Sequence, residues 1–457
     1  MSSPIQRTKK EDTAETTPLR VISRDEHPIT LELMDHDALF VMKKLQNAGF
    51  SAYLVGGGVR DIYLGKTPKD FDISTDARPG QLRRLFRNSA TIGRRFKLVQ
   101  LFFKHSKIIE VSTLRSLSEH DLDGPESVLA PNNTFGTLDQ DALRRDLTIN
   151  SLFYEIEHQT IIDYVGGVED LDHSIIRIVG DPDIRLNRDP VRIMRAIRHA
   201  ARNHFTIEPK SWTSICRHQH KLSLCPPSRL RDEMFKDLSG GFAGPWFKLA
   251  DKAGIFLTLF PIYKQDLYTT DRQGNGIKDQ LERILKVIDR FSLLHKKGTR
   301  PPTADYFSLA LLLLPWANSR FGITDMEIKG PALFHLSKQI RDAINKELGV
   351  QLNLRRSLRQ EATNLLTNLA LFIFHHKKST LPHWLKKKSY FERANLFYHC
   401  YLEAETGQPV PDKLLHLSPK RPETRQAPLK KTGRCSSKGR NRPAFVSTAK
   451  GSIFGLK

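Results

Sequence analysis

The sequence predicts a mixed α/β head domain followed by an all-helical neck and body and a disordered basic tail. Three observations predict this order. Strand-like and helix-like apolar runs alternate up to about residue 170, and beyond residue 185 nearly all apolar runs repeat at helical spacing. The last 40 residues carry 11 Lys or Arg against one acid, with almost no apolar pattern. At 457 residues, the chain is long enough for roughly two to four domains.

The head is expected to follow a disordered N-terminal segment, residues 1–27, which has mixed charge and no apolar periodicity. A helix is predicted over residues 35–49, because its apolar side chains recur at helical spacing and Gly49 can end it. A buried strand over residues 52–55 then runs into three glycines and a short helix that ends at Gly65. Further strands are predicted over residues 71–74, 98–103 and 108–114, with a helix over residues 81–86 among them.

The second half of the chain has the apolar pattern of helices. Helical periodicity covers residues 190–202, 228–238, 281–294, 307–316 and 358–374. We therefore divide the chain into a head at residues 28–170, a neck at 171–238, a body at 239–417 and a tail at 418–457.

No segment of the sequence has the features of a membrane span or an export signal. The longest apolar stretch, residues 306–316, is shorter than the ~18 residues that a bilayer span needs. Residues 1–26 contain no apolar signal core. Four cysteines in 457 residues form no disulfide framework, which is typical of a reducing compartment. We therefore expect a cytoplasmic protein.

The charge of the chain indicates the class of its partner. There are 72 Lys and Arg against 50 Asp and Glu, a net charge of +22. Such an excess favours a polyanion, with nucleic acid ahead of an anionic membrane surface. A net charge of +10 lies in residues 418–457, which we expect to contact nucleic-acid phosphates without reading sequence. A tail that only improves solubility is the alternative.

The densest chemical signal is a glycine turn followed by two carboxylates. Gly56, Gly57 and Gly58 lie between a predicted strand and a helix, where backbone N–H groups can approach phosphate oxygens. Asp70 and Asp72 follow, and residues i and i+2 of a strand point to the same face. Two adjacent carboxylates repel unless a cation lies between them, and Mg²⁺ suits both carboxylate and phosphate oxygens. A surface turn or a strand edge is the alternative for the Asp pair.

Two further motifs carry charged side chains. Glu110 lies in a strand-like run of β-branched residues, where an acid faces either a site or solvent. Arg144, Arg145 and Asp146 precede an apolar run. The arginines can donate paired hydrogen bonds to a triphosphate. The aspartate can accept a hydrogen bond from a ribose hydroxyl or contribute to the shell around a metal ion. A charged helix start is the alternative for this second motif.

A third motif opens a predicted helix in the neck. Asp189 is a good N-cap and Pro190 fits the first helical position. Asp189 could accept from an exocyclic amino group and Arg192 donate to a ring nitrogen, which is the pattern that reads a base edge. One side of the helix carries four arginines, which form either a basic stripe facing a cleft or a solvated face: Arg192, Arg195, Arg198 and Arg202.

In this order, the motifs resemble those of the bacterial poly(A) polymerase and tRNA nucleotidyltransferase family, the class II branch of the polymerase-β-like nucleotidyltransferases. The resemblance covers about residues 20–265. It implies a polymerase-β-like α/β nucleotidyltransferase head that is catalytic, a neck that binds nucleotide and RNA, and a body that binds RNA. It implies a catalytic set of Asp70, Asp72, Glu110 and Asp146, of which the first three hold metal. Nucleotide contacts are expected from Gly56, Gly57, Arg60, Arg144, Arg145, Asp189, Arg192, Arg195 and Arg198.

Within this family we favour untemplated poly(A) addition over CCA addition to tRNA, with a non-catalytic RNA-binding protein as the remote alternative. A tail that grips any RNA suits sequence-blind extension. We expect two Mg²⁺ ions, ATP as the substrate, RNA 3′ ends as acceptors and release of pyrophosphate. The expected role is in RNA polyadenylation, processing and decay, with the RNA-degradation machinery as a candidate partner. One departure from the family pattern is Arg188, which stands where a Glu usually precedes the Asp.

Overall fold

The computed structural model describes residues 19–93, 97–116, 134–271, 274–325, 331–377 and 381–416. The expected disordered tail at residues 418–457 lies outside these ranges. Within them, the helices lack the combination of length and apolar character that crossing a bilayer requires.

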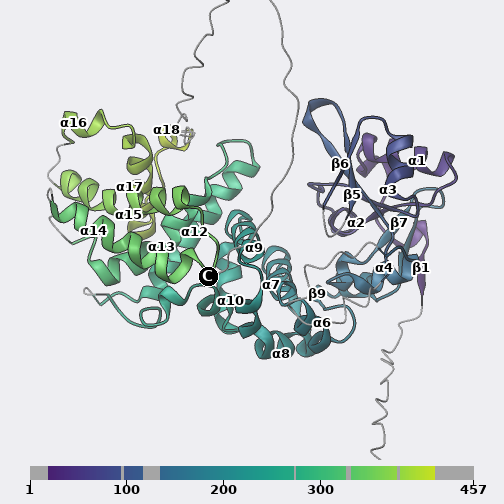
Figure 1. Cartoon of the computed structure of the whole chain (residues 1–457), viewed down its shortest axis with the longest axis horizontal. Helices are drawn as coiled ribbons and strands as arrows, with labels where there is room; N and C mark the ends of the chain where they lie inside the picture. Colours follow the sequence, from purple (N-terminus) through teal and green to yellow (C-terminus); the bar gives the residue numbers. More distant parts are fainter. Residues whose placement is uncertain are drawn as a thin grey trace, which may run out of the picture. The chain divides into compact units, whose positions relative to one another are not determined.

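The head is built on one mixed sheet of eight strands (Figure 1), in the order β1-β8-β7-β2-β3-β6-β5-β4. Two neighbouring inner strands, β3 (Asp72–Thr75) and β6 (Ile108–Thr113), pair in parallel. All other neighbours in the sheet pair antiparallel. The remaining strands are β1 (Arg20–Ile22), β2 (Ala52–Val55), β4 (Ser89–Ile92), β5 (Leu98–Phe102), β7 (Phe153–Glu155) and β8 (Thr160–Asp163).

Strand β1 corrects the expected disorder at residues 1–27. Arg20–Ile22 pairs antiparallel with β8 at the edge of the sheet, and Ile22 is 1% exposed. The prediction is therefore wrong from residue 20 onward. A three-residue edge strand is too short to show a period, and a partner 140 residues along the chain decides that it forms.

Five short helices accompany the sheet. In α1 (His36–Asn47), the side chain of Asp35 caps the first turn by accepting from the backbone N–H groups of Asp37 and Ala38. The buried face of α1 consists of Ala38, Val41, Met42 and Leu45, so the helix predicted over residues 35–49 is confirmed. The other helices of the head are α2 (Gly57–Tyr63), α3 (Pro79–Leu85), α4 (Leu138–Arg144) and α5 (Gly167–Asp172).

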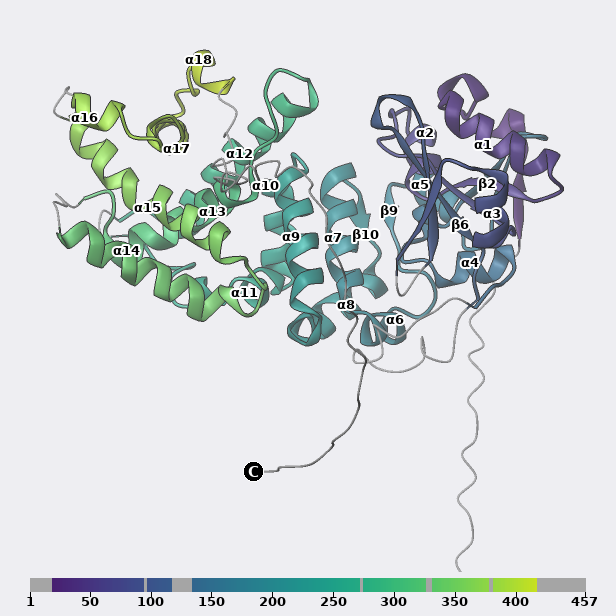
Figure 2. The same ribbon diagram turned by 45° about the horizontal axis from the view of Figure 1, so that its top comes forward.

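Beyond residue 180 the chain is helical, as the apolar periodicity predicts (Figure 1 and Figure 2). Among the described residues of this half, the one strand is β10 (Thr206–Ile207), which pairs in parallel with β9 (Ile175–Ile176). The helices between residues 180 and 260 are α6 (Pro182–Arg188), α7 (Val191–Asn203), α8 (Pro209–His218), α9 (Pro227–Ser239), α10 (Ala243–Lys252) and α11 (Ile255–Leu259). Those that follow are α12 (Ile277–Lys296), α13 (Asp305–Phe321), α14 (Pro331–Ile344), α15 (Arg356–Lys377), α16 (His383–Lys386), α17 (Phe391–Thr406) and α18 (Asp412–Leu415).

The apolar stretch at residues 306–316 forms the interior of the helical half. It lies in α13, whose residues from Phe307 to Ala317 are all buried. Helices α12 and α15 pack against α13 and cover it. A helix that is apolar on all sides is therefore a core helix here, as its short length predicts.

Candidate active site

The glycine turn predicted from the sequence connects β2 to α2. Gly56 has φ +65° and ψ −128°, a conformation that a residue with a Cβ rarely adopts. A Cβ on Gly56 would lie 3.4 Å from Nη1 of Arg145, and one on Gly57 would lie 3.3 Å from Nη2 of Arg60. The turn therefore needs glycine both for its backbone angle and because two guanidinium groups lie against it.

Two of the three predicted metal ligands lie side by side in the sheet. The parallel register of β3 and β6 places Asp72 opposite Glu110. Glu110 is partly buried and accepts a hydrogen bond of 2.9 Å from Nε2 of Gln100 on β5. Displacement of solvent by neighbouring atoms, together with the like charges of Glu110 and Asp70, raises the pKa of Asp72 to about 6. Arg145 opposes this shift.

Asp70 differs from its expected position. Strand β3 begins at Asp72, so Asp70 lies in the preceding loop, exposed to solvent. It is close enough for its charge to raise the pKa of Asp72. Asp70 and Asp72 therefore do not share one face of a strand as predicted, although the loop brings Asp70 close enough to act on the charge of Asp72.

The carboxylates of Asp70, Asp72 and Glu110 fit a hard cation. They are oxygen donors that repel one another, and Mg²⁺ binds to one or two protein carboxylates while it keeps several waters. Their oxygens do not all lie within 4.8 Å of one another. The described residues contain one three-residue group that meets this criterion, formed by Glu155, Glu157 and His158 in the turn after β7. Both carboxylate oxygens of Glu155 already accept hydrogen bonds within that turn.

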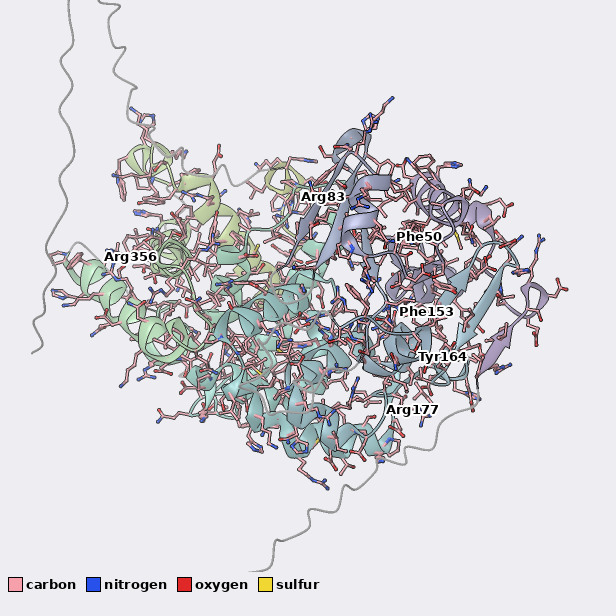
Figure 3. The ribbon with its side chains drawn as sticks, turned by 45° about the vertical axis from the view of Figure 1, so that its right-hand side comes forward. Phe50, Arg83, Phe153, Tyr164, Arg177 and Arg356 are labelled. Atoms are coloured by element: carbon pink, nitrogen blue, oxygen red, sulfur yellow. The ribbon has the colours of Figure 1, made fainter. Side chains whose placement is uncertain are left out.

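Of the predicted arginine pair, Arg145 is the one that lies on the glycine turn. Its Nε and Nη2 donate to Oδ2 of Asp141 at 3.2 and 2.9 Å, and Nη2 also donates to Oγ of Ser74 on β3 at 3.3 Å. Its guanidinium carbon lies 5.0 Å from the ring centroid of Phe153, which Figure 3 labels. Arg144 instead lies 3.6 Å from Oδ1 of Asp141. The sequence could not distinguish the two arginines.

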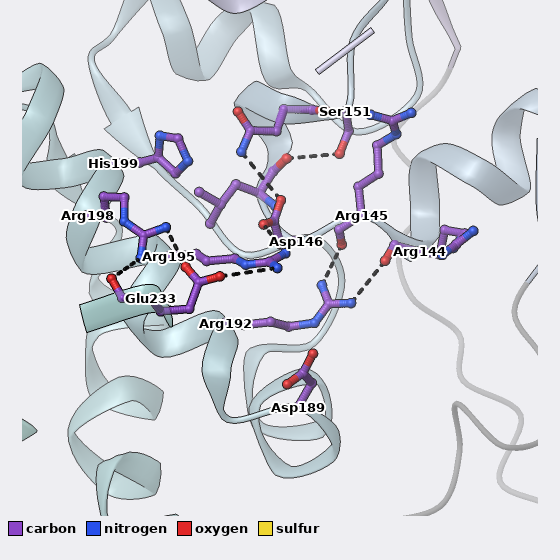
Figure 4. A network of polar contacts seen from close by, with 12 residues as sticks. Arg144, Arg145, Asp146, Ser151, Asp189, Arg192, Arg195, Arg198, His199 and Glu233 are labelled. Carbon is purple, nitrogen blue, oxygen red and sulfur yellow. Dashed lines mark hydrogen bonds and ion pairs between the residues drawn. The ribbon is translucent and has the colours of Figure 1, made fainter. Parts of the chain in front are cut away.

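Asp146 is buried in a network of positive charge (Figure 4). Its Oδ1 accepts from the backbone N–H of Leu147 at 2.9 Å, and its Oδ2 lies 3.3 Å from Nη1 of Arg195 on α7. Burial alone would raise the pKa of Asp146, but Arg195, Arg192 and His199 hold it well below its usual range. Asp146 is therefore ionised and connects the end of α4 to α7.

The four arginines of α7 form neither an open basic stripe nor a solvated face. Arg192 donates to the carbonyl oxygens of Arg145 and Arg144 at 2.7 and 3.0 Å, as Figure 4 shows. Arg195 pairs with Asp146. The remaining two pair with acids of other helices: Arg198 with Glu233 and Asp237 of α9, both at 2.5 Å, and Arg202 with Asp61 of α2 at 2.8 Å.

Two of the arginines expected to contact nucleotide, Arg198 and Arg60, take part in ion pairs in the structure. Arg198 is 12% exposed at its side chain and is held by acids of α9, so its role in the structure is to join α7 to α9. Arg60 is 3% exposed and donates to Asp61 at 2.7 Å and to Oδ1 of Asn150 at 2.5 Å. Both guanidinium groups are buried and paired, and neither is open to a phosphate. A sequence shows the charge of a side chain but not the distant partner that neutralises it.

Asp189 retains a free acceptor atom. It ends α6 instead of capping α7, which begins at Val191 with Pro190 in the N-cap position. Its Oδ2 accepts from Nη2 of Arg229 at 3.0 Å, whereas its Oδ1 is buried without a hydrogen-bond partner among the described residues. Burial opposes ionisation, but Arg229, Arg192 and Arg195 lower the pKa of Asp189. An ionised, buried oxygen without a donor is an unsatisfied group that a ligand could complete.

Two residues of this network carry no signal that singles them out in the sequence. Asn150 accepts from Arg60 and donates to Oδ1 of Asp146 at 3.4 Å, so it bridges the two. His199 lies 3.3 Å from Nη1 of Arg60, and burial together with this arginine lowers its pKa well below the usual value. Asn150 and His199 each follow a motif residue by four positions, which is the only sequence feature that relates them to the site.

Two family models match the chain in succession. The model for the "Poly A polymerase head domain" matches residues 52–177, which contain the glycine turn, the carboxylates and the arginine pair. The model for the "Probable RNA and SrmB- binding site of polymerase A" matches residues 204–267, which contain α9 and α10.

Curated relatives fall into two groups. Poly(A) polymerase I of Escherichia coli O6:H1 is 41% identical over 276 residues, which are 59% of this chain and 59% of the relative. Poly(A) polymerase I of Haemophilus influenzae is 39% identical over 293 residues, which are 63% of this chain and 64% of the relative. The CCA-adding enzyme of Bacillus subtilis is 36% identical over 204 residues, covering 44% of this chain and 50% of that enzyme. The chain therefore matches about three fifths of the length of these poly(A) polymerases.

Among solved structures, the Bacillus stearothermophilus CCA-adding enzyme in complex with CTP is similar to the chain. The TM-score is 0.60 at 25% identity, covering 84% of this chain and 81% of that one. A mixed nucleotidyltransferase sheet followed by a helical body is thus the fold of both proteins, which confirms the predicted fold class. The chain is similar in sequence to bacterial poly(A) polymerases and, over a shorter region, to CCA-adding enzymes.

Proposed function

We propose that the chain is a poly(A) polymerase that adds AMP from ATP to the 3′ ends of RNA without a template. The observation that carries this proposal is the pairing of Asp72 with Glu110 beside a glycine turn on which Arg145 lies. Adjacent carboxylates, a phosphate-accepting turn and an arginine are the groups that nucleotidyl transfer requires. The proposed role in the cell is RNA polyadenylation, which affects RNA processing and decay.

The residues of the head have distinct proposed tasks. Asp70, Asp72 and Glu110 would hold Mg²⁺, which when bound neutralises the triphosphate and activates the attacking hydroxyl. Gly56 and Gly57 offer backbone N–H groups to the triphosphate, and Arg145 offers the guanidinium that lies on the turn. The RNA 3′-hydroxyl forms a bond to the α-phosphorus of ATP, the bond from that phosphorus to the bridging oxygen breaks, and pyrophosphate leaves.

Base recognition is assigned to Asp189. Its unpartnered Oδ1 can accept from the exocyclic amino group of adenine, which restores a hydrogen bond that the buried oxygen lacks. Arg192 lies beside it (Figure 4), but its guanidinium donates to two backbone carbonyl oxygens, so Arg192 would position the site unless a nucleotide displaces those bonds. Arg188 stands where a Glu usually precedes this Asp, so Asp189 is the acid of the motif in this chain. Arg188 is partly buried.

Two considerations favour poly(A) addition over CCA addition. The similarity to the poly(A) polymerases extends over a larger part of the chain than the similarity to the CCA-adding enzymes. The basic residues at 418–457 suit an enzyme that holds RNA of any sequence. CCA addition is the second candidate, because the Bacillus subtilis CCA-adding enzyme is 36% identical over the region that it matches.

The experiment that tests the proposal extends two RNAs, a generic oligoribonucleotide and a tRNA that lacks its CCA end. Each is incubated with Mg²⁺ and either ATP or CTP, and the products are separated on a gel. Long ladders on the generic RNA with ATP alone are expected. One to three additions that are confined to tRNA and require CTP would establish CCA addition, and no extension of either RNA would leave only RNA binding.

The proposed metal site is tested with the variant Asp72→Ala, and Asp76→Ala is the matched control. Asp72 is a proposed metal ligand, and its removal should lower AMP addition by about 10³-fold or more, since metal-ion stabilisation of the transition state contributes several kcal/mol. Asp76 is an exposed carboxylate just beyond the same strand and accepts from the backbone N–H of Ser51 at 2.9 Å. Equal activity of the two variants would contradict the proposed metal site.

A further inference from the structure

Away from the proposed metal-binding carboxylates, the structure contains a pocket of about 350 Å³ lined by side chains of α9, the first residue of α13, and Arg355 and Leu358 at the junction with α15. This volume is at the lower end of the range of ~300–1,000 Å³ that is typical of small-ligand sites. Only the α9 side falls within the region of RNA-binding similarity. The lining residues that matter here are Arg231, Phe235 and Lys236 of α9, Asp305 in the first turn of α13, and Arg355 and Leu358 at the start of α15.

Two opposite charges in this pocket have no partner. Among the described residues, the side chains of Asp305 and Arg355 form no hydrogen bond and no ion pair. The other cations are engaged. Arg231 pairs with Asp232 at 2.8 Å and donates to the carbonyl oxygen of Asn353 at 3.0 Å, and Lys236 pairs with Glu233 at 3.2 Å. The pocket thus offers one free acceptor and one free donor to a ligand.

The side chains of Asp305 and Arg355 line the same pocket, and their charges interact. Exclusion of solvent raises the pKa of Asp305, while Arg231 and Arg355 both lower it. The pocket also has an apolar surface, because Phe235 and Leu358 line it. A ligand that satisfies all three features has an anionic part, a donor group and a flat apolar face.

We propose that this pocket holds one nucleotide of the single-stranded RNA whose 3′ end is extended. The phosphate is placed against Arg355, the base lies on Phe235, and Asp305 accepts from an exocyclic amino group. A nucleotide has the anion, the donor and the aromatic face that the lining requires, and base stacking on an aromatic side chain is a common mode of single-strand binding. This inference rests on the proposed function, since it assigns an acceptor RNA to the same protein.

The proposal implies a base preference. Adenine, cytosine and guanine carry an exocyclic amino group, but uracil presents only carbonyl oxygens there. The carboxylate of Asp305 accepts and cannot donate, so it would favour oligo(A) over oligo(U). Asp305→Asn replaces one acceptor by an N–H₂ group that can donate to uracil, so the preference should become smaller in this variant.

The test is equilibrium binding of the full chain to fluorescently labelled oligo(A) and oligo(U) of about 15 nucleotides, measured by anisotropy without ATP or Mg²⁺. Arg355→Gln should weaken binding of oligo(A) by about fivefold to tenfold and reduce the slope of log affinity against log salt by about 0.7. Asp305→Asn should reduce the ratio of oligo(A) to oligo(U) affinity by about fivefold. Both residues are exposed and unpaired, so the variants should melt at the temperature of the unsubstituted protein.

The matched control is Arg356→Gln. Arg356 is the next residue, begins α15, is exposed and does not line the pocket (Figure 3). It should change the affinity by less than about twofold. Equal losses in the Arg355 and Arg356 variants would overturn the proposal, because they would show only a general effect of charge. An unchanged oligo(A) to oligo(U) ratio in Asp305→Asn would overturn it as well.

The outcome for this pocket is separable from that for the proposed function. AMP addition by the unsubstituted protein is measured on a gel with the same RNAs. Extension with no difference between the Arg355 and Arg356 variants would overturn the pocket and leave the poly(A) polymerase assignment. Binding that depends on Arg355 and Asp305 in a protein that extends no RNA would overturn the polymerase assignment and support the pocket.

Discussion

Asp72 on β3 lies directly opposite Glu110 on β6, in the one parallel pair of the eight-stranded sheet. The two carboxylates come from strands 38 residues apart in sequence, and their like charges, with solvent exclusion, raise the pKa of Asp72 to about 6. Two carboxylates this close repel each other and destabilise the folded protein when no cation is bound. A bound cation attracts both and stabilises the folded protein. The first prediction follows from this linkage.

Replacement of Asp72 by Asn should stabilise the metal-free protein at pH 7. The pKa of Asp72 is higher in the folded than in the unfolded state, so the folded state loses stability as pH rises from about 4 through about 6. Asn removes that loss. In EDTA at pH 7.5 the melting temperature should rise by an amount on the order of 1–2 °C. Differential scanning calorimetry measures this, with Asp76→Asn as the control.

In the presence of Mg²⁺, the unsubstituted chain should melt at a higher temperature than the Asp72→Asn variant. Mg²⁺ should raise the melting temperature of the unsubstituted chain, and increasingly so as pH rises through about 6, because the carboxylate must lose its proton to bind metal. The Asp72→Asn variant should respond much less. Equal Mg²⁺ responses of both proteins would place the ion elsewhere.

Arg192 is expected to stabilise the connection between α4 and α7. It donates to the carbonyl oxygens of Arg144 and Arg145, and Arg192→Ala leaves both without this donor. The free energy of unfolding should fall by about 1–3 kcal/mol, as for hydrogen bonds that involve a charged group. Urea denaturation measures this change. Arg188→Ala serves as the control, since Arg188 makes no described hydrogen bond or ion pair, and it should change stability by less than about 0.5 kcal/mol.

Asp189→Asn should relax the choice of nucleotide. The buried Oδ1 is unpartnered, and an amide at this position presents a donor as well as an acceptor. The ratio of kcat/KM for ATP to that for UTP should fall by about tenfold, the cost of one mismatched base contact. Single-nucleotide addition to a generic RNA with each nucleotide measures the ratio. If the variant keeps the ratio of the unsubstituted enzyme, Asp189 does not read the base.

Removal of residues 418–457 should weaken RNA binding and flatten its dependence on salt. The segment has a net charge of +10, and each phosphate contact that is lost reduces the slope of log affinity against log salt by about 0.7 for single-stranded RNA. Filter binding at several salt concentrations measures the slope. AMP addition at saturating RNA should persist, because the head and its carboxylates are unaltered. A salt slope equal to that of the full chain would exclude this role for the segment.

Some of the site was predictable from the sequence because its signals are local. A glycine with a positive φ between a strand and a helix, as at Gly56, follows from the steric cost that every other residue would incur there. Asp72 and Glu110 lie in strand-like runs that the sheet confirms. Arg145 was one of two equivalent arginines, and only the contacts with Asp141 and Ser74 distinguish it.

The pairing of charges could not be predicted. Arg198 and Arg202 each have an acid partner that lies on another helix, and the fold brings it close. The edge strand at Arg20–Ile22 forms because β8 offers it hydrogen bonds. Asp70 lies in a loop, so the two-residue period that predicted its direction does not apply.

By itself, the sequence determined which chemical groups the protein has and the order of its elements. Periodicity and glycine positions depend on neighbours a few residues away, so they can be read along the chain. The tertiary structure decided which charges remain available. The side chains of Asp305 and Arg355 stay unpaired and Asp189 keeps a free oxygen, while Arg195 and Arg198 of α7 pair with acids. Coulombic and hydrogen-bond energies depend on distances of a few ångströms between residues far apart in sequence, and only the folded chain sets those distances.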